Sequence, residues 1–243
     1  MQNLSEITAY GHLSAELYSG ENRQAIFDGY LRTWQDKSLP VLSAMCGTGD
    51  FLIRFAEQGA DIDGIDASEH MLNILKRRCK EKDLTPNVYH QLLQELSLPR
   101  KYGYVFMPDR CFGLVANKDH ALQSLKLIWD HMLPGGKLVL DLRQPQPNHD
   151  DSDIPRKWHQ NRPDGTKLYG TNVVSYEEEG HIWRIIGKKE LKKDDQLIEA
   201  ETLDYRERFY QKDEFLDLLK QANFQTVETR YAFDCKDPQE GFG

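Results

Sequence analysis

The sequence predicts an α/β fold, with a mostly parallel β-sheet and helices on both of its faces. β-prone runs and helical segments alternate over residues 41–142. The first run ends in the turn CGTG at residues 46–49, and the second run ends at Asp66. Such alternation implies parallel strands joined by right-handed crossovers. The glycine turn indicates that bare backbone approaches a ligand there, because residues without Cβ adopt positive φ freely.

Residues 1–36 precede the alternating region and are expected to form a helical lid. Apolar side chains recur there at helical spacings. Ser19-Gly20 divides the pattern, so the expected lid consists of two short helices.

Residues 40–142 are expected to form the parallel sheet and the helices that cover it. The predicted strands lie near residues 41–45, 61–66, 87–91, 103–107 and 137–142, and the predicted helices near residues 50–59, 69–82 and 118–132. Ligands of open parallel sheets bind outside the carboxyl ends of the strands. The loops that follow the five strands should therefore converge on one site.

The pattern changes after the fifth predicted strand. Residues 143–157 are rich in proline and acidic residues and are expected to form an irregular loop. Three β-prone runs with short polar separators follow, at residues 167–175, 182–191 and 197–210. They predict an antiparallel β cap over residues 158–210, inserted after strand five.

The remaining segment, residues 211–234, is expected to add a last helix at residues 212–222 and a strand at residues 224–233. The whole chain, residues 1–243, is thus expected to be a single domain.

Composition and charge exclude several classes of protein. The chain has 243 residues and a formal net charge of -8, which argues against nucleic acid as a partner, because tight phosphate-backbone binding relies on clusters of Lys and Arg. No apolar run approaches the roughly 18 residues of a membrane span, and the N-terminus lacks a signal-peptide pattern. We therefore expect a cytoplasmic protein without a membrane partner. The four cysteines lack CxxC spacing, so neither a disulfide framework nor a metal site is expected.

The glycine turn also narrows the choice of cofactor. The dinucleotide fingerprint needs a glycine at position 52, where this chain has Leu52. The phosphate-loop pattern needs Lys followed by Ser or Thr after its last glycine, where this chain has Asp50-Phe51. A cofactor with adenosine at one end and no phosphate fits better. Asp66 stands where a carboxylate would accept hydrogen bonds from the ribose hydroxyls.

Four motifs, in order over residues 40–142, resemble those of class I S-adenosylmethionine-dependent methyltransferases. VLSAMCGTG resembles the first glycine motif, and GIDASEHML resembles the strand end and helix start that hold ribose and adenine. NVYHQLLQELSLPRKYGYVFMPDRCFGLV resembles the third and fourth strands, and HMLPGGKLVLDL resembles the Pro-Gly-Gly turn into the fifth. The resemblance implies a Rossmann-like fold, S-adenosylmethionine as cofactor, and a bacterial branch of small-molecule or unassigned methyltransferases.

The cofactor-binding residues follow from the glycine turn, from Asp66 and from this resemblance. The resemblance implies that residues 91–93 contact adenine, that Met107-Pro108 lie beside the sulfonium, and that Tyr18 caps the cofactor. The full expected set is Tyr18, Cys46, Gly47, Thr48, Gly49, Asp66, Ala67, Met71, Gln91, Leu92, Leu93, Met107 and Pro108.

The methyl acceptor is less defined by the sequence. The run Met107-Pro108-Asp109-Arg110 is unlike the Asn/Asp-Pro-Pro-aromatic motif of methylases that act on base amines or glutamine. We therefore expect a small-molecule acceptor, methylated on nitrogen or oxygen. The expected acceptor-contacting residues are Arg110, Arg143, Tyr169 and Trp183, and the imaginable bases are His120, His149 and Tyr169. The identity of the acceptor, any catalytic residue and the oligomeric state stay open.

Three departures from the family pattern leave a second hypothesis open. Ser43, Leu92 and Gly103 stand where the family commonly has acids. Losing acceptors for the amino groups of the cofactor would weaken its binding. The chain could instead be a non-catalytic protein that binds S-adenosylmethionine or S-adenosylhomocysteine, as a sensor or a partner subunit.

Overall fold

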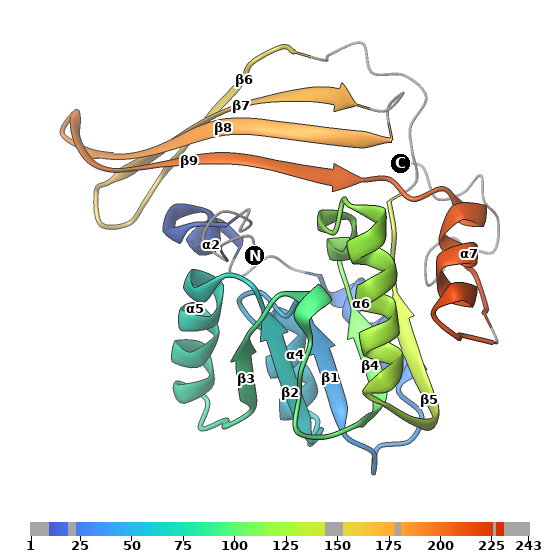
Figure 1. Cartoon of the computed structure of the whole chain (residues 1–243). Coiled ribbons are helices and arrows are strands. Elements are labelled where there is room, and N and C mark those ends of the chain that lie inside the picture. The colour runs from blue at the N-terminus through green and yellow to red at the C-terminus, as the bar shows by residue number, and fades with distance from the viewer. Residues whose placement is uncertain (1–9, 19–22, 144–152, 178–180, 226, 231–243) are drawn as a thin grey trace.

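Two separate β-sheets, with helices around and between them, make up the structure (Figure 1). This computed structural model describes residues 10–18, 23–143, 153–177, 181–225 and 227–230. The first sheet has five parallel strands in the order β3-β2-β1-β4-β5, and the second has four strands in the order β6-β7-β8-β9. The predicted fold class, a parallel sheet flanked by helices with an antiparallel sheet after strand five, is confirmed.

The elements of the parallel sheet lie close to their predicted positions. The strands are β1 (Val41–Ala44), β2 (Ile62–Asp66), β3 (Asn87–His90), β4 (Tyr102–Met107) and β5 (Met132–Leu140), and the helices between them are α4 (Asp50–Glu57), α5 (Glu69–Lys80) and α6 (Lys118–Asp130). Strand β5 begins five residues earlier than predicted and contains the Pro-Gly-Gly turn.

The central strands are buried on both faces, which their apolar sequences require. Every residue of β1 and of β4 is buried. Val41 packs in a cluster with Phe55 of α4, whereas its neighbour Leu42 packs in a second cluster with Leu125 of α6. Successive side chains of a strand point to opposite faces, so one apolar run supplies two cores.

The N-terminal segment forms two helices, α2 (His12–Tyr18) and α3 (Gln24–Thr33), on either side of the predicted break. Only α2 lies beneath the second sheet, next to α5 (Figure 1). Helix α3 buries Phe27 and Tyr30 in the core beside Phe51 and Phe55. The expected lid is therefore reduced to α2, because the aromatic side chains of α3 are part of the main core.

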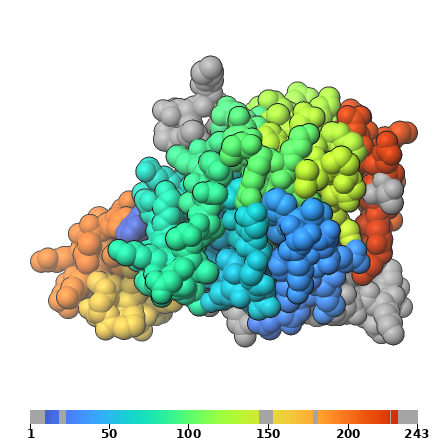
Figure 2. Space-filling model, turned by 90° about the horizontal axis from the view of Figure 1, so that it is seen from below, coloured from blue at the N-terminus to red at the C-terminus, as the bar shows by residue number. Residues whose placement is uncertain are grey.

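The β cap, defined as strands β6 to β9, is an antiparallel meander that lies across the carboxyl ends of the parallel strands (Figure 1). Its strands are β6 (Arg156–Asn161), β7 (Lys167–Glu177), β8 (Ile182–Lys193) and β9 (Gln196–Arg208). Strand β6 was not predicted as a strand, because its sequence RKWHQN is polar and mostly exposed at the sheet edge. Seen from below, the yellow and orange atoms of the cap extend past the core on one side (Figure 2).

Helix α7 (Lys212–Gln221) follows the β cap, as predicted, and begins with a capping box formed by Gln211 and Glu214. It lies on the side of the core opposite to the projecting cap (Figure 2). The strand predicted at residues 224–233 is absent from residues 224–225 and 227–230, and the rest of that range lies outside the described residues. Within the described part of the chain, no helix is both long and apolar enough to cross a membrane.

Candidate functional site

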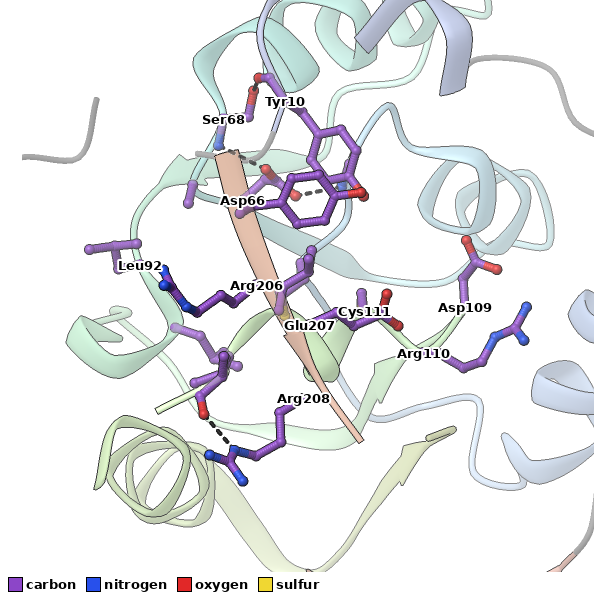
Figure 3. Close-up of a pocket in the computed structure, with 18 of the residues that line it drawn as sticks. Tyr10, Asp66, Ser68, Leu92, Asp109, Arg110, Cys111, Arg206, Glu207 and Arg208 are labelled. Carbon is purple, nitrogen blue, oxygen red and sulfur yellow. Dashed lines mark hydrogen bonds between the residues drawn. The ribbon is translucent and has the colours of Figure 1, made fainter. Parts of the chain in front are cut away.

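A cavity of about 1180 Å³ lies between the carboxyl ends of the parallel strands and the β cap. Its walls come from the loops after β1, β2, β3 and β4, from the segment that leads into α2, and from β7, β8 and β9. Figure 3 shows Asp66, Cys111, Glu207 and Tyr10 around this space, although each comes from a different segment of the chain. The loops therefore converge as the rule for parallel sheets predicts.

The turn after β1 brings the backbone of Gly47 to the cavity, and the close packing of Gly49 against α5 holds the turn in place. Gly47 has φ +54°, and a Cβ built on it would meet nothing within 4 Å. Gly49 has φ +86°, but a Cβ there would lie 2.8 Å from Cγ of Leu75 on α5. Gly47 thus leaves its peptide open toward a ligand, whereas Gly49 lets α5 pack closely and does not line the cavity.

Asp66 joins the ends of β1 and β2 through its two carboxylate oxygens. Oδ2 accepts a hydrogen bond from the backbone N–H of Gly47 at 2.8 Å, and Oδ1 accepts one from the N–H of Ser68 at 2.8 Å (Figure 3). Burial raises the pKa of this carboxyl group, and the two backbone hydrogen bonds oppose that shift. Each oxygen keeps one lone pair for a further donor. Two such acceptors side by side fit the vicinal hydroxyls of a ribose.

Two tyrosines, one just before α2 and one at its end, line the cavity. Tyr10 donates a hydrogen bond from its hydroxyl to Tyr18 at 3.2 Å, and its carbonyl accepts one from the hydroxyl of Ser68 at 2.7 Å. Both tyrosines line the cavity, as expected for Tyr18. Tyr10 was not among the residues predicted from the sequence, because it precedes the helix. Its aromatic side chain, eight positions before Tyr18, was the one feature that could have indicated it.

Helix α2 is fastened to the β cap by Glu201 of β9. Its carboxylate accepts hydrogen bonds from the N–H groups of Leu13 at 2.7 Å and Ser14 at 3.2 Å, and from the hydroxyl of Ser14. These N–H groups belong to the first turn of α2 and have no partners within the helix. Glu201 therefore acts as an N-terminal cap supplied by a distant strand.

Replacing Glu201 by alanine should loosen α2 without unfolding the core. Hydrogen bonds to a charged group contribute about 1.5 to 3 kcal/mol, so local opening of the helix should increase about ten- to hundredfold. Hydrogen exchange of the peptide covering residues 11–18 measures this opening. Asp204→Ala, on the opposite face of the same strand, should leave the exchange of that peptide unchanged. Equal exchange rates in wild type and Glu201→Ala would contradict the assignment.

The other expected cofactor-binding residues divide into those that line the cavity and one that does not. Besides Tyr18, Gly47 and Asp66, the lining includes Cys46, Thr48, Ala67, Met71, Gln91, Leu92, Leu93 and Pro108. Met107 is fully buried in the core, and its carbonyl accepts a hydrogen bond from the hydroxyl of Tyr30 at 3.1 Å. The prediction for the Met107 side chain is corrected, since of that pair only Pro108 lines the cavity.

The alternation of side chains along the strands of the β cap decides which of the predicted acceptor residues face the cavity. In β8, Ile185 is 7% exposed and Ile186 is 44% exposed, which separates an inner face from an outer face. The strand register places Asn172, Val174, Trp183, Ile185, Tyr205 and Glu207 together on the inner face, and all six line the cavity.

Tyr169 lies on the outer face, where it pairs with Glu190 across the sheet and lies beneath the ammonium group of Lys192. It does not line the cavity, so the prediction that Tyr169 contacts the acceptor is corrected. Arg110, Arg143 and Trp183 line the cavity, and their contact with the acceptor stays a prediction. His120 lines it too, and His149 lies outside the described residues. Sequence reasoning missed Glu207, whose alternation with Arg206 and Arg208 was the only signal.

No group of three or more His, Cys, Asp or Glu residues that could hold a metal ion occurs among the residues that the structure describes. Some acidic side chains of the cavity are paired with cations or backbone donors. Asp109, for example, lies 2.6 Å from the guanidinium of Arg23.

A five-stranded parallel sheet in the order 3-2-1-4-5, a glycine turn after β1 and a half-buried aspartate at the end of β2 define the Rossmann-like fold of class I methyltransferases. Residues 41–136 match the family model described as a methyltransferase domain. The match confirms the expected methyltransferase class for this part of the chain.

Comparison with curated proteins finds partial matches. The chain is 34% identical over 115 residues to a demethylmenaquinone methyltransferase of Listeria welshimeri, covering 45% of this chain and 47% of that protein. It is 25% identical over 147 residues to the cypemycin N-terminal methyltransferase of a Streptomyces species, covering 58% of this chain and 59% of that protein. The chain thus matches about half of the length of these relatives.

The fold itself extends over most of the chain. The structure superimposes on the sugar N-methyltransferase KedS8 of a Streptoalloteichus species with a TM-score of 0.72, covering 88% of this chain and 85% of that one. The sequence identity is 17%, so this likeness concerns the fold.

Proposed function

We propose that the chain transfers a methyl group from S-adenosylmethionine to a small-molecule acceptor bound between the core and the β cap. The observation that carries this proposal is the continuity of the cavity. One space of about 1180 Å³ is lined both by the glycine turn with Asp66 and by the inner face of the β cap. Pockets for single ligands have volumes of about 300 to 1,000 Å³. The cavity has room for a cofactor and a second molecule.

The residues present fit the cofactor, which would occupy the part of the cavity next to β1, β2 and β3. Asp66 would hold the ribose hydroxyls, and the open peptide at Gly47 would lie near the methionyl part. Leu92 and Leu93, buried after β3, would flank the adenine, together with Met71 of α5. Tyr10 and Tyr18 would cover this part from the side of α2.

The bound cofactor would supply a methyl group already activated by a positively charged sulfur. The protein then has to hold the acceptor in line with that methyl group and to exclude water, and such positioning can contribute about 7 to 11 kcal/mol. The β cap and α2 would do both: Val174 and Ile185 present apolar surface to the cavity, and α2 closes the side toward α5. The relatives that act on amino groups or small molecules support an acceptor of this class.

The alternative, a non-catalytic binder, was based on three positions that lack the acid common in the family. One of the three, Gly103, lies far from the cavity. Gly103 lies at the amino end of β4, where its N–H donates to the carbonyl of Pro40 and a Cβ would lie 2.5 Å from Leu39. That end of the sheet is remote from the cavity. Ser43 is buried in β1, and its hydroxyl has no hydrogen-bond partner within the described chain. Ser43 and Leu92 remain as departures near the site.

Two measurements test the proposal in sequence. Titration calorimetry with S-adenosylmethionine and S-adenosylhomocysteine should show binding of both. Transfer of a labelled methyl group should then occur to at least one member of a panel of amines, phenols and carboxylates. Binding without transfer would favour the non-catalytic alternative, and absence of binding would overturn both.

A further inference from the structure

One carboxylate in the cap part of the cavity, that of Glu207, lacks a close partner. Its side chain is 17% exposed. Among the described residues, the one cation within ion-pair distance is Arg143, whose Nε lies 3.8 Å from Oε1 of Glu207. This separation is too long for a hydrogen bond. The carboxylate therefore keeps its hydrogen-bonding capacity for a molecule that enters the cavity.

Arg143 is held away from Glu207 by aromatic side chains. Its guanidinium carbon lies 5.1 Å from the ring centre of Trp183 and 5.8 Å from that of Phe209. Cation–π attraction of this kind stabilises the guanidinium over the rings. The Nε atom of Arg143 is buried and forms no hydrogen bond within the described residues. The arginine thus offsets part of the charge of Glu207 from a distance but does not occupy its oxygen atoms.

A mostly buried carboxylate without hydrogen bonds is costly in the empty protein. Burial raises the pKa of Glu207, Arg143 and Arg110 oppose that shift, and Asp109 adds to it. An ionisable group that is perturbed in this way and faces a cavity is a candidate for binding or proton transfer.

The surroundings of Glu207 define what it can receive. Val174, Trp183, Ile185 and Tyr205 share the inner face of the β cap with it and give the carboxylate apolar and aromatic neighbours, while Arg110, Arg206 and Arg208 also line the same cavity. Figure 3 shows Glu207 near the middle of the lining residues. A molecule that fits has an apolar body and a cationic hydrogen-bond donor.

We propose that the methyl acceptor is an amine, and that Glu207 binds its ammonium group and takes up one of its protons. This inference rests on the proposed function and narrows its acceptor class. The proton moves from the nitrogen to an Oε atom of Glu207, which leaves a neutral amine and a neutral carboxylic acid, so that charge is conserved. The neutral nitrogen carries the free lone pair that a nucleophile requires.

Two probes of nearly equal shape test this assignment directly. 2-Phenylethylamine and 2-phenylethanol differ only in the ammonium or hydroxyl group at the end of the same apolar body. Calorimetry should show that the wild-type protein binds the amine at least about tenfold more tightly than the alcohol, since a charged hydrogen bond is lost in the alcohol. In Glu207→Gln, the preference should fall below about threefold. Both titrations are made with and without S-adenosylhomocysteine.

The matched control is Glu199→Gln, which changes a carboxylate on the same face of β9. Glu199 lies 3.1 Å from the imidazole of His12 and does not line the cavity, so this variant should keep the wild-type preference. Equal binding of the two probes, no binding of the amine, or an unchanged preference in Glu207→Gln would each overturn the inference. Failure of the proposed function differs from failure of this inference. The first appears as absent cofactor binding or absent methyl transfer, whereas the second appears in the probe preference, which is measured on the free protein.

Discussion

Replacing Asp66 by alanine should weaken the binding of S-adenosylmethionine about ten- to hundredfold. The two carboxylate oxygens each have a lone pair directed to a further donor, and hydrogen bonds to a charged group contribute about 1.5 to 3 kcal/mol. The same change removes the acceptor for the N–H groups of Gly47 and Ser68. The glycine turn should therefore lose order together with the ribose contact, and both effects lower the affinity.

Titration calorimetry measures this loss, and thermal unfolding shows whether the variant is folded. Glu69→Ala is a suitable control, because Glu69 is an exposed acid in the first turn of α5, three residues further along the chain. Its affinity for the cofactor should match that of the wild type. A folded Asp66→Ala protein with unchanged affinity would remove Asp66 from the cofactor site.

Replacing Asp63 by alanine should lower the free energy of unfolding by about 3 to 5 kcal/mol, the cost of breaking a buried ion pair. Asp63 is 1% exposed and accepts three hydrogen bonds at the end of the sheet opposite the cavity. The donors are Nε of Arg100 at 2.7 Å, the hydroxyl of Tyr102 at 2.7 Å and Nδ2 of Asn87 at 3.0 Å. The alanine variant would leave the buried hydroxyl of Tyr102 without its acceptor.

Urea denaturation followed by circular dichroism measures this change. Asp61→Ala is the matched control, because Asp61 binds the same guanidinium at 2.6 and 2.8 Å but its side chain is 64% exposed. Exposed ion pairs contribute at most about 1 kcal/mol, so this variant should be nearly as stable as the wild type. Equal losses in the two variants would show that burial of Asp63 does not determine the energy.

The parallel sheet was predictable because its strands are buried on both faces. Runs such as VLSA and YGYVFM are largely apolar, and a glycine turn marks where the first of them ends. The carboxyl-end rule then places Gly47, Asp66 and Leu92 at one edge without any knowledge of contacts. Asp66 was predicted as a cofactor residue from its position at the end of the second strand and from the resemblance of GIDASEHML.

The β cap was harder to interpret, because apolar residues occur on both of its faces. Ile185 and Ile186 are adjacent, as are Val173 and Val174, so alternation does not reveal which face is buried. Tyr169 and Trp183 were therefore both assigned to the acceptor, although the register places them on opposite faces. Strand β6 was not predicted for a related reason. A polar edge strand has no apolar pattern of its own, so only its pairing with β7 identifies it.

The sequence by itself determined the class of fold, the positions of the parallel strands along the chain and the cofactor edge, because each depends on local patterns that a single strand or turn carries. Only the tertiary structure decided which residues face the cavity from the β cap and how α2 is fastened to it. Glu201 and the amides of α2 are 187 and 188 residues apart in the chain. Contacts at such separation follow from strand register and packing, which no local pattern specifies.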